Sequence, residues 1–382
     1  MKSLLVLCFT DLKNDARVTR QVNFLKETYR VTAAVFDAYP DPGRELFVIK
    51  KTNLTFLRKA VASVFLLLGI NRIAYALLHN YQSYVPTLRD RKFDIIVAND
   101  IEALPLAFSI AGQHSKVFFD AHEYAPRHFE DRLYWRIFFQ RFNTALCRHY
   151  IPRVAGMSTI NNGLASEYEK HFGVKPIIVT NASPFIDLHA NASVANPIRL
   201  VHHGIFNMSR RPELMIDMME ALDNRFTLDL IYLLPGSASP QTKEYFETYK
   251  AKAAATGKIN ILPALKGSEI VPSLHATYDL GIILIPPVNF NYENGLPNKL
   301  FDCIQARIGM VAGPLREIAQ IVKHYDIGVV SEDFTGQGMA NALKALTTND
   351  IARFKANTDV AARELSAEHN QKIFLEALAR IA

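Results

Sequence analysis

Cysteine is scarce in this sequence of 382 residues. Its three cysteines, Cys8, Cys147 and Cys303, lie far apart among apolar neighbours, and no two of them form a CxxC pair. A few scattered cysteines of odd number argue against both a disulfide framework and a cysteine-based zinc site. We therefore expect the protein to work in a reducing compartment, the cytoplasm.

Long apolar runs are also missing. The longest, from Val61 to Ile70, is interrupted by Ser63 and Gly69, and it has about half of the ~20 residues that a helix needs to span a bilayer. The apolar run near the N-terminus ends at Asp11 without a small-residue cleavage site. A buried first strand is therefore favoured over a signal peptide.

The chain has few acidic residues for its number of basic ones. The net charge is +6, while the hydrophobic content of 49% and the charged content of 21% are ordinary for a globular protein. An excess of positive charge favours polyanionic partners such as nucleotide phosphates or phospholipid headgroups. No zinc finger, recognition helix or aromatic RNA-binding motif is present, so no nucleic-acid partner is expected.

Short apolar runs alternate with helical patterns along the whole chain. The runs predict strands over residues 4–9, 31–36, 95–98, 117–119, 155–158 and 177–180, and again over 199–203, 228–234, 259–262, 280–285, 309–312 and 328–330. Continuous apolar strands separated by helices indicate parallel sheets covered on both faces. The predicted fold class is α/β, with two Rossmann-like doubly wound domains that face each other across a cleft. Ligands of such sheets bind outside the carboxyl ends of the strands.

The alternation of strand and helix patterns is interrupted once, in a segment with two prolines and several small or polar residues. We therefore predict an N-terminal Rossmann-like domain in residues 1–183, a linker in 184–197 and a C-terminal Rossmann-like domain in 198–365. Residues 366–382 are predicted to form a C-terminal helix that is able to pack back on the N-terminal domain.

The most informative segment is NFNYENGLPNKLFDCIQARIGMVAG, residues 289–313. Pro297 suits the first turn of a helix, and Gly295 lets the backbone approach a ligand closely. Free N–H groups at the helix start, together with Lys299, would form an anion site. Asp302 lies three residues further along, on the same helical face, where its carboxylate can accept hydrogen bonds from a ribose diol.

This segment resembles the family 4 retaining glycosyltransferases, which have the GT-B fold. That family carries two glutamates eight residues apart, and the resemblance places Asn294 at the first and Asp302, as a ribose ligand, at the second. Both glutamates are replaced here, and the family's usual glycine and proline at the next strand are absent. The run from Leu296 to Asp302 is similar to a leucine-proline-x-lysine variant found in polysaccharide-assembly members. Asn294, Gly295 and Leu296 are thereby implied as donor-binding residues.

A second match begins at the segment His-His-Gly that ends at Gly204. In the family a strand ends in glycine, and an arginine and a lysine downstream hold the diphosphate. Arg210 falls at the lysine position, whereas Ile205 replaces the arginine. The resemblance implies that Arg210 or Arg211 holds the diphosphate together with Lys299, and a guanidinium fork suits two phosphate oxygens.

Two loops of the first half supply the other candidates. Asp120, His122 and Glu123 follow a predicted strand directly, and the resemblance implies that His122 contacts the transferred sugar or orients the acceptor. Arg17, Asp120 and Glu123 are candidates for the acceptor side. Arg17 follows Asp15, a residue type that commonly caps a helix, and is expected to face the cleft.

The resemblance implies a retaining glycosyltransferase that moves a sugar from a nucleotide-diphosphate sugar to a glycan or lipid-linked acceptor. The implied pathway is the assembly of capsule, exopolysaccharide or lipopolysaccharide. His122, Arg210 and Lys299 are the catalytic candidates, and the two cations would stabilise the leaving diphosphate. No DxD pair is placed as a metal motif, so neither a cofactor nor a metal is expected. The alternatives are a nucleotide-sugar 2-epimerase on the same fold and a non-catalytic nucleotide-binding partner of another transferase.

Residues 54–78 and 127–153 mix apolar or aromatic side chains with basic ones. This composition suits the interface of an anionic membrane, and packing in the protein core explains the apolar residues equally well. The first interpretation predicts a protein that lies peripherally at the inner face of the plasma membrane.

Overall fold

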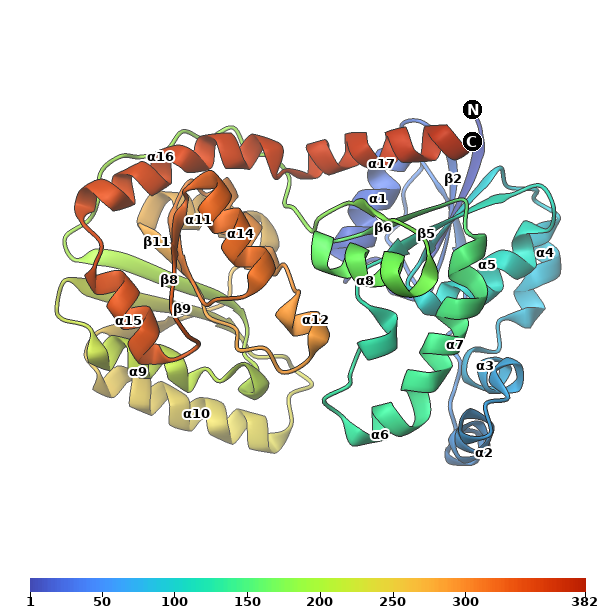
Figure 1. Cartoon of the computed structure of the whole chain (residues 1–382), viewed down its shortest axis with the longest axis horizontal. Helices are drawn as coiled ribbons and strands as arrows, with labels where there is room; N and C mark the ends of the chain where they lie inside the picture. Colours follow the sequence, from blue (N-terminus) through green and yellow to red (C-terminus); the bar gives the residue numbers. More distant parts are fainter. The chain divides into compact units, whose positions relative to one another are not determined.

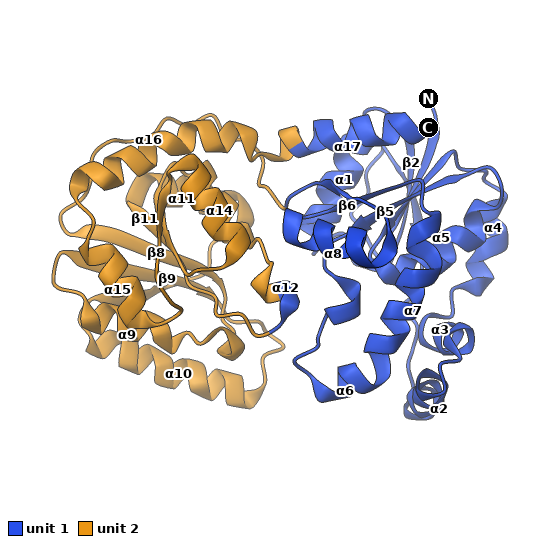
Figure 2. Ribbon diagram, viewed as in Figure 1, with its two compact units in different colours: residues 1–180, 289–291, 370–382 blue, residues 181–288, 292–369 orange.

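The computed structural model describes residues 1–382 and divides into two compact α/β units (Figures 1 and 2). Unit 1 comprises residues 1–180, 289–291 and 370–382, and unit 2 comprises residues 181–288 and 292–369. Each unit contains one sheet in which every pair of neighbouring strands is parallel. These sheets confirm the predicted α/β class with a doubly wound sheet in each half of the chain.

Seven strands form the sheet of unit 1, in the order β3-β2-β1-β4-β5-β6-β7. Their bounds are β1 (Ser3–Leu7), β2 (Arg30–Val35), β3 (Glu45–Val48), β4 (Ile95–Asn99), β5 (Lys116–Ala121), β6 (Gly156–Thr159) and β7 (Ile177–Ile178). Leu5 pairs with Thr32 on one side and with Ile96 on the other. The strand order reverses between β1 and β4, and this reversal is where open α/β sheets bind ligands.

Six strands form the sheet of unit 2, in the order β10-β9-β8-β11-β12-β13. Their bounds are β8 (Ile198–Ile205), β9 (Phe226–Leu233), β10 (Ile259–Leu262), β11 (Leu280–Ile283), β12 (Gly309–Ala312) and β13 (Gly328–Val330). Leu280 of β11 pairs with Leu200 of β8. The order reverses between these two strands, so unit 2 has its own ligand-binding position at their carboxyl ends.

Helices cover both sheets. Their bounds are α1 (Ala16–Leu25), α2 (Phe56–Leu67), α3 (Asn71–His79), α4 (Val85–Arg89), α5 (Leu104–Ala111), α6 (Leu133–Trp135), α7 (Arg141–Tyr150), α8 (Asn162–Phe172), α9 (Glu213–Ala221), α10 (Pro240–Ala255), α11 (Gly267–Thr277), α12 (Phe290–Glu293), α13 (Asn298–Gln305), α14 (Arg316–Tyr325), α15 (Gly336–Lys344), α16 (Thr348–Glu364) and α17 (Ala367–Ile381). Short 3₁₀ turns occupy Gln82–Tyr84, Ile101–Ala103, Ala125–Arg127, Ile151–Arg153 and Met208–Arg210. No helix combines the length and the apolar character needed to cross a membrane.

The last helix, α17, belongs to unit 1 from Asn370 onward. Phe374 and Leu378 are buried among the apolar side chains of the sheet, and the ring of Phe374 lies 5.0 Å from that of Phe118. At the start of the helix, the Asn370 side chain donates to the backbone oxygen of Thr180 at 3.0 Å. The final residues of the chain therefore complete the core of its first half.

Two local features depart from a simple alternation of strands and helices. A π-helical turn, Arg136–Gln140, separates α6 from α7. Strand β3 was not predicted, because its sequence ELFV is short and mostly exposed, so it lacks the continuous apolar run of a central strand. All twelve predicted strands are present, with ends that shift by a few residues.

Candidate functional site

The polar residues of unit 2 gather where β8 and β11 meet. Strand β8 carries His202, His203 and Gly204 just before its last residue, and α13 follows β11 and carries Lys299. Helix α13 packs directly on β11, because a Cβ atom at Gly281 would lie only 2.3 Å from the Cys303 sulfur. This close packing brings the first turn of α13 to the end of β8.

Lys299 is a buried cation with a neutral partner. Only 6% of Lys299 is exposed, and its Nζ lies 2.9 Å from Nε2 of His202. The Nδ1 atom of His202 lies 2.8 Å from the backbone oxygen of Ile282, which can only accept a hydrogen bond. Nδ1 therefore carries the proton, and the lone pair of Nε2 accepts from the Lys299 ammonium.

Burial lowers the pKa of Lys299 to about 7, and the positive charge of Arg210 acts in the same direction. The neighbouring Asp302 raises this pKa, but not enough to offset the two larger effects. Burial and the Lys299 charge also lower the pKa of His203 to about 3, so this imidazole is neutral near pH 7. The site therefore has positive potential that an anion would neutralise.

Two buried nitrogen atoms of this site have no hydrogen-bond partner. They are Nε of Arg210 and Nε2 of His203, and the His203 atom lies 3.8 Å from a carboxylate oxygen of Asp302. The Arg210 guanidinium lies 5.7 Å from the centre of the Tyr292 ring. Buried polar atoms are nearly always paired in folded proteins, so these two indicate a ligand that supplies the missing partners.

Gly204 lies beside Lys299 and needs to be glycine. Its φ of +134° is a backbone conformation that other residues rarely adopt, and a Cβ atom there would lie 3.7 Å from the Lys299 ammonium. The strand end therefore leaves its backbone open next to the cation, as a site that holds a phosphate closely requires.

Apart from Arg211, the remaining predicted residues of unit 2 lie in the turn before α13 or in α13 itself. Asn294 and Leu296 are buried in the turn before α13, where the N–H of Gly295 donates to the Tyr292 oxygen at 3.2 Å. Asp302 accepts a hydrogen bond from the Ser183 hydroxyl at 2.7 Å.

Arg211 behaves differently from its neighbour Arg210. Its side chain is 58% exposed and pairs with Glu213 at 3.1 Å. It lines a separate cavity of about 530 Å³ together with Asp217 and Glu220. The structure therefore brings Arg210 close to Lys299 but directs Arg211 toward acidic side chains, where a diphosphate would be repelled.

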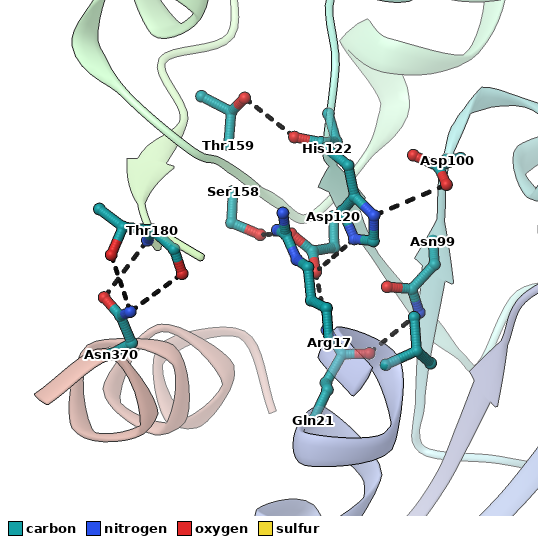
Figure 3. A network of polar contacts seen from close by, with 12 residues as sticks. Arg17, Gln21, Asn99, Asp100, Asp120, His122, Ser158, Thr159, Thr180 and Asn370 are labelled. Carbon is teal, nitrogen blue, oxygen red and sulfur yellow. Dashed lines mark hydrogen bonds and ion pairs between the residues drawn. The ribbon is translucent and has the colours of Figure 1, made fainter. Parts of the chain in front are cut away.

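In unit 1, Asp120 is the centre of a polar network at the carboxyl ends of the strands (Figure 3). One of its carboxylate oxygens accepts from Arg17 at 3.0 Å and from the Ser158 hydroxyl at 2.7 Å. The other accepts from Gln21 at 2.8 Å and lies 3.3 Å from Nε2 of His122. Arg17, expected to face the cleft, forms an ion pair with a carboxylate of its own unit.

The charges of this network determine its protonation. Burial would raise the pKa of Asp120, but Arg17 and His122 outweigh it and hold that pKa well below its usual range. For His122, burial and Arg17 lower the pKa, whereas Asp100 and Asp120 raise it more, so the net shift is upward. The imidazole is therefore held in a fixed orientation between carboxylates and favours its charged form.

Asp100 supports His122 from the other side. Its carboxylate lies 3.7 Å from Nδ1 of the imidazole, and its own backbone has φ +62° and ψ 160°, a region normally restricted to glycine. Strain of this kind concentrates at functional sites, where it holds a side chain in place. Glu123, in contrast, is largely exposed and forms an ion pair with His128.

Several residues of the two sites were not assigned a role from the sequence. His202 and His203 lay within a noted segment, but their roles depend on Lys299, which is distant in the sequence. Asn99 is the last residue of β4, and Asp120 and Ser158 are the second-last residues of β5 and β6. Polar residues at the carboxyl ends of consecutive apolar strands are the signal that could have identified them.

The two doubly wound units, each with its switch point, define the GT-B fold of glycosyltransferases. No protein-family model matches the chain, and no curated protein matches it. Among solved structures, it is similar to Alr3699/HepE of Anabaena in complex with UDP-glucose, with 15% identity over 100% of both chains and a TM-score of 0.67. It is also similar to the lipopolysaccharide outer core galactosyltransferase WaaB, with 10% identity over 100% of both chains and a TM-score of 0.68.

A third similar structure is a UDP-forming α,α-trehalose-phosphate synthase of Burkholderia xenovorans. The identity is 13%, the alignment covers 100% of this chain and 99% of the synthase, and the TM-score is 0.71. These similarities extend over the whole chain and therefore include both units, at sequence identities that establish the fold alone.

Proposed function

We propose that the protein is a glycosyltransferase that takes a sugar from a nucleotide-diphosphate sugar. The observation that carries this proposal is a pair of cations at the switch point of unit 2. Lys299 is buried beside Gly204, and Arg210 is half-buried with a buried Nε that has no partner. A diphosphate has the negative charge and the acceptor atoms that this pair lacks. The similar structure of HepE, which contains UDP-glucose, supports the choice of donor.

The chemistry follows from the charge that develops when the glycosidic bond breaks. The bonding electrons pass to the leaving diphosphate, and preorganised cations in a buried site stabilise that charge most effectively. Lys299 and Arg210 donate hydrogen bonds to phosphate oxygens, and the N-terminus of α13 adds its positive dipole end. We propose that this arrangement works without a metal ion, so that transfer continues in the presence of EDTA.

The acceptor side rests on the resemblance described above. We propose retention of the anomeric configuration and a glycan or lipid-linked acceptor of surface polysaccharide assembly. His122, oriented by Asp120 and Asp100, is proposed to hydrogen-bond the sugar or the acceptor. Thermal melting with a panel of nucleotide sugars identifies the donor, since a ligand that binds the folded state raises the melting temperature.

The panel also separates the alternatives. A matched donor that is consumed only when an acceptor is added supports transfer. Donor that is converted to free nucleotide without any acceptor indicates the 2-epimerase, and binding without turnover indicates the non-catalytic partner. A panel in which no nucleotide sugar shifts the melting temperature contradicts the proposed function.

Binding of the donor is expected to take up a proton. Unliganded Lys299 has a pKa of about 7, so at about pH 8 most molecules carry a neutral amine, and a bound diphosphate raises the pKa by favouring the charged form. Affinity should therefore fall as the pH rises above 7. Calorimetry at about pH 8 in buffers of different ionisation enthalpy should show uptake of up to one proton. The same uptake in Lys299→Met would contradict this assignment.

His202 is expected to act as a positioning residue for Lys299. His202→Phe removes the acceptor of the Lys299 ammonium, and loss of a hydrogen bond to a charged group should weaken donor binding about tenfold or more. It should also lower the Lys299 pKa, and so shift the pH dependence of donor affinity to lower pH. His202→Gln, which keeps an acceptor, should restore much of the affinity. An unshifted pH profile in His202→Phe would leave His202 with a packing role only.

A further inference from the structure

Helix α2 of unit 1 exposes an apolar face that the protein itself does not cover. Phe56 is 89% exposed, Leu57 72% and Leu68, at the helix end, 66%. Val61, Val64 and Leu67 are exposed as well. Side chains of this type normally lie in a core, so a run of them on one helix indicates a partner surface.

The exposed residues form one contiguous arc. With 3.6 residues per turn, these six residues fall within about 140° of the helix circumference. Ala62 and Leu66 lie on the opposite side and are buried in unit 1. Arg58 donates hydrogen bonds to the backbone oxygens of Ala76 and Leu77, which joins α2 to α3. The helix is therefore held by one side while it presents the other to solvent.

Neighbouring elements extend the apolar face. Ile70 and Ile73 are exposed at the start of α3, and Leu133, Tyr134 and Ile137 are exposed in α6 and the turn that follows it. That turn packs beside α2, and Figure 2 shows α2, α3 and α6 at the same end of unit 1. Trp135 and Phe142 of the same segment are buried, so residues 127–153 contribute both to the core and to this surface.

Nearly all of the charges around the apolar face are positive, and the exposed Asp131, two residues before Leu133, is an exception. No aspartate or glutamate occurs between Glu45 and Asp90, or between Asp131 and Glu167. The exposed basic residues of these segments include Lys59, Arg72, Arg132, Arg136, Arg141 and Arg148. Arg141 and Arg148 line a groove of about 760 Å³ next to the α2–α3 turn. His149 and Asn71 line the same groove.

We propose that this face docks the protein on an anionic phospholipid bilayer. Apolar side chains of an amphipathic helix enter the acyl region, while flanking lysine and arginine side chains bind the phosphate headgroups. A second copy of the chain is the less suitable occupant, because a symmetric dimer would place the same cations of both copies against one another. The docking does not depend on the proposed function, since it involves neither Lys299 nor His122.

Vesicle sedimentation tests the proposal directly. The full-length protein should bind vesicles that contain phosphatidylglycerol and should bind pure phosphatidylcholine vesicles about tenfold or more weakly, because the latter offer no net negative charge. The combined substitution Leu57→Gln, Val64→Gln and Leu68→Gln should weaken binding to the anionic vesicles by about tenfold or more. Its melting temperature should stay unchanged, because the three side chains are exposed. Val360→Gln on α16, which replaces an equally exposed valine of unit 2, is the matched control.

A second variant tests the charge independently of the apolar side chains. Arg136→Glu with Arg148→Glu should weaken binding to anionic vesicles and reduce its dependence on salt. The proposal is overturned if the wild-type protein binds neither vesicle, binds both equally, or keeps its affinity in the triple variant. A dimer in sedimentation velocity that the triple variant dissociates would assign the face to a second copy and would also overturn it.

Discussion

Lys299→Ala is expected to slow sugar transfer by about 10²–10³-fold, the usual loss when one preorganised donor to a developing negative charge is removed. Lys299 is buried, donates to His202 and lies next to Gly204 and Arg210. No other ammonium is in place to substitute for it. Initial rates with the matched donor and acceptor measure the loss. A variant that keeps more than about a tenth of the wild-type rate would show that Lys299 does not stabilise the charge on the leaving diphosphate.

A loss of activity counts only if the variant still folds, and the structure predicts that it does. The folded-state pKa of Lys299 is about 7, below the ~10.4 of an unfolded chain. A lysine with a lowered pKa destabilises the fold fully below its folded-state pKa, and the penalty declines progressively between about pH 7 and the unfolded pKa of ~10.4. Near pH 6, Lys299→Met should therefore melt at the same temperature as the wild type or higher.

Lys355 provides the matched control for this stability effect. It is equally buried in unit 2, but its ammonium pairs with the Asp279 carboxylate at 3.2 Å. Lys355→Met leaves that carboxylate buried without its cation, so this variant should melt at a lower temperature than the wild type. A melting temperature that falls in Lys355→Met but not in Lys299→Met would show that Lys299 is retained for a ligand. A lower melting temperature in both variants would indicate a structural role for both lysines.

Asp120→Asn is expected to have the second-largest effect. It should lower the free energy of unfolding by about 3–5 kcal/mol, because it breaks a buried pair and leaves a charged partner without its carboxylate. Arg17, Gln21, Ser158 and His122 all contact this one side chain. Transfer should fall as well, since His122 loses the group that orients it. Urea denaturation followed by fluorescence measures the stability difference.

The pH dependence of this difference has a defined sign. The pKa of Asp120 is lowered in the folded state, so its carboxylate stabilises the fold at pH values above its unfolded pKa of ~3.9. That stabilisation is lost as the pH falls toward the lower folded-state pKa. Wild type and Asp120→Asn should therefore differ most near neutral pH and converge in acid.

Asp223→Asn is the control for Asp120→Asn. Asp223 pairs with Arg225 at an exposed position, and exposed pairs contribute little to stability. This variant should unfold like the wild type at every pH. If Asp120→Asn also had the same free energy of unfolding as the wild type, the buried network would not stabilise the fold.

The fold could be predicted from the sequence because it depends on local pattern. The apolar runs of β1 and β4 are fully buried, and such runs separated by helices are typical of parallel sheets. Lys299, Gly204 and Arg210 could also be predicted from the sequence, since each lies at a characteristic position relative to a strand end or a helix start. Strand β3 was missed because an exposed edge strand has no such pattern.

The rest of the site depends on contacts between residues that are distant in the sequence. The protonation of His202 is fixed by the oxygen of Ile282, and the backbone N–H of the strained Asp100 donates to the oxygen of Asp120. No spacing encodes either feature. Composition also left open whether residues 54–78 are core or surface, because Leu66 and Leu57 are the same residue type with opposite burial.

A crystal structure with the matched nucleoside diphosphate shows whether Lys299 and Arg210 hold the diphosphate. Phosphate oxygens should lie within about 3 Å of Nζ of Lys299 and of the Arg210 guanidinium, the usual distance of a hydrogen bond. The backbone of Gly204 should lie against the same phosphates. A diphosphate bound elsewhere in the protein, with Lys299 still donating only to His202, would contradict the proposed diphosphate site.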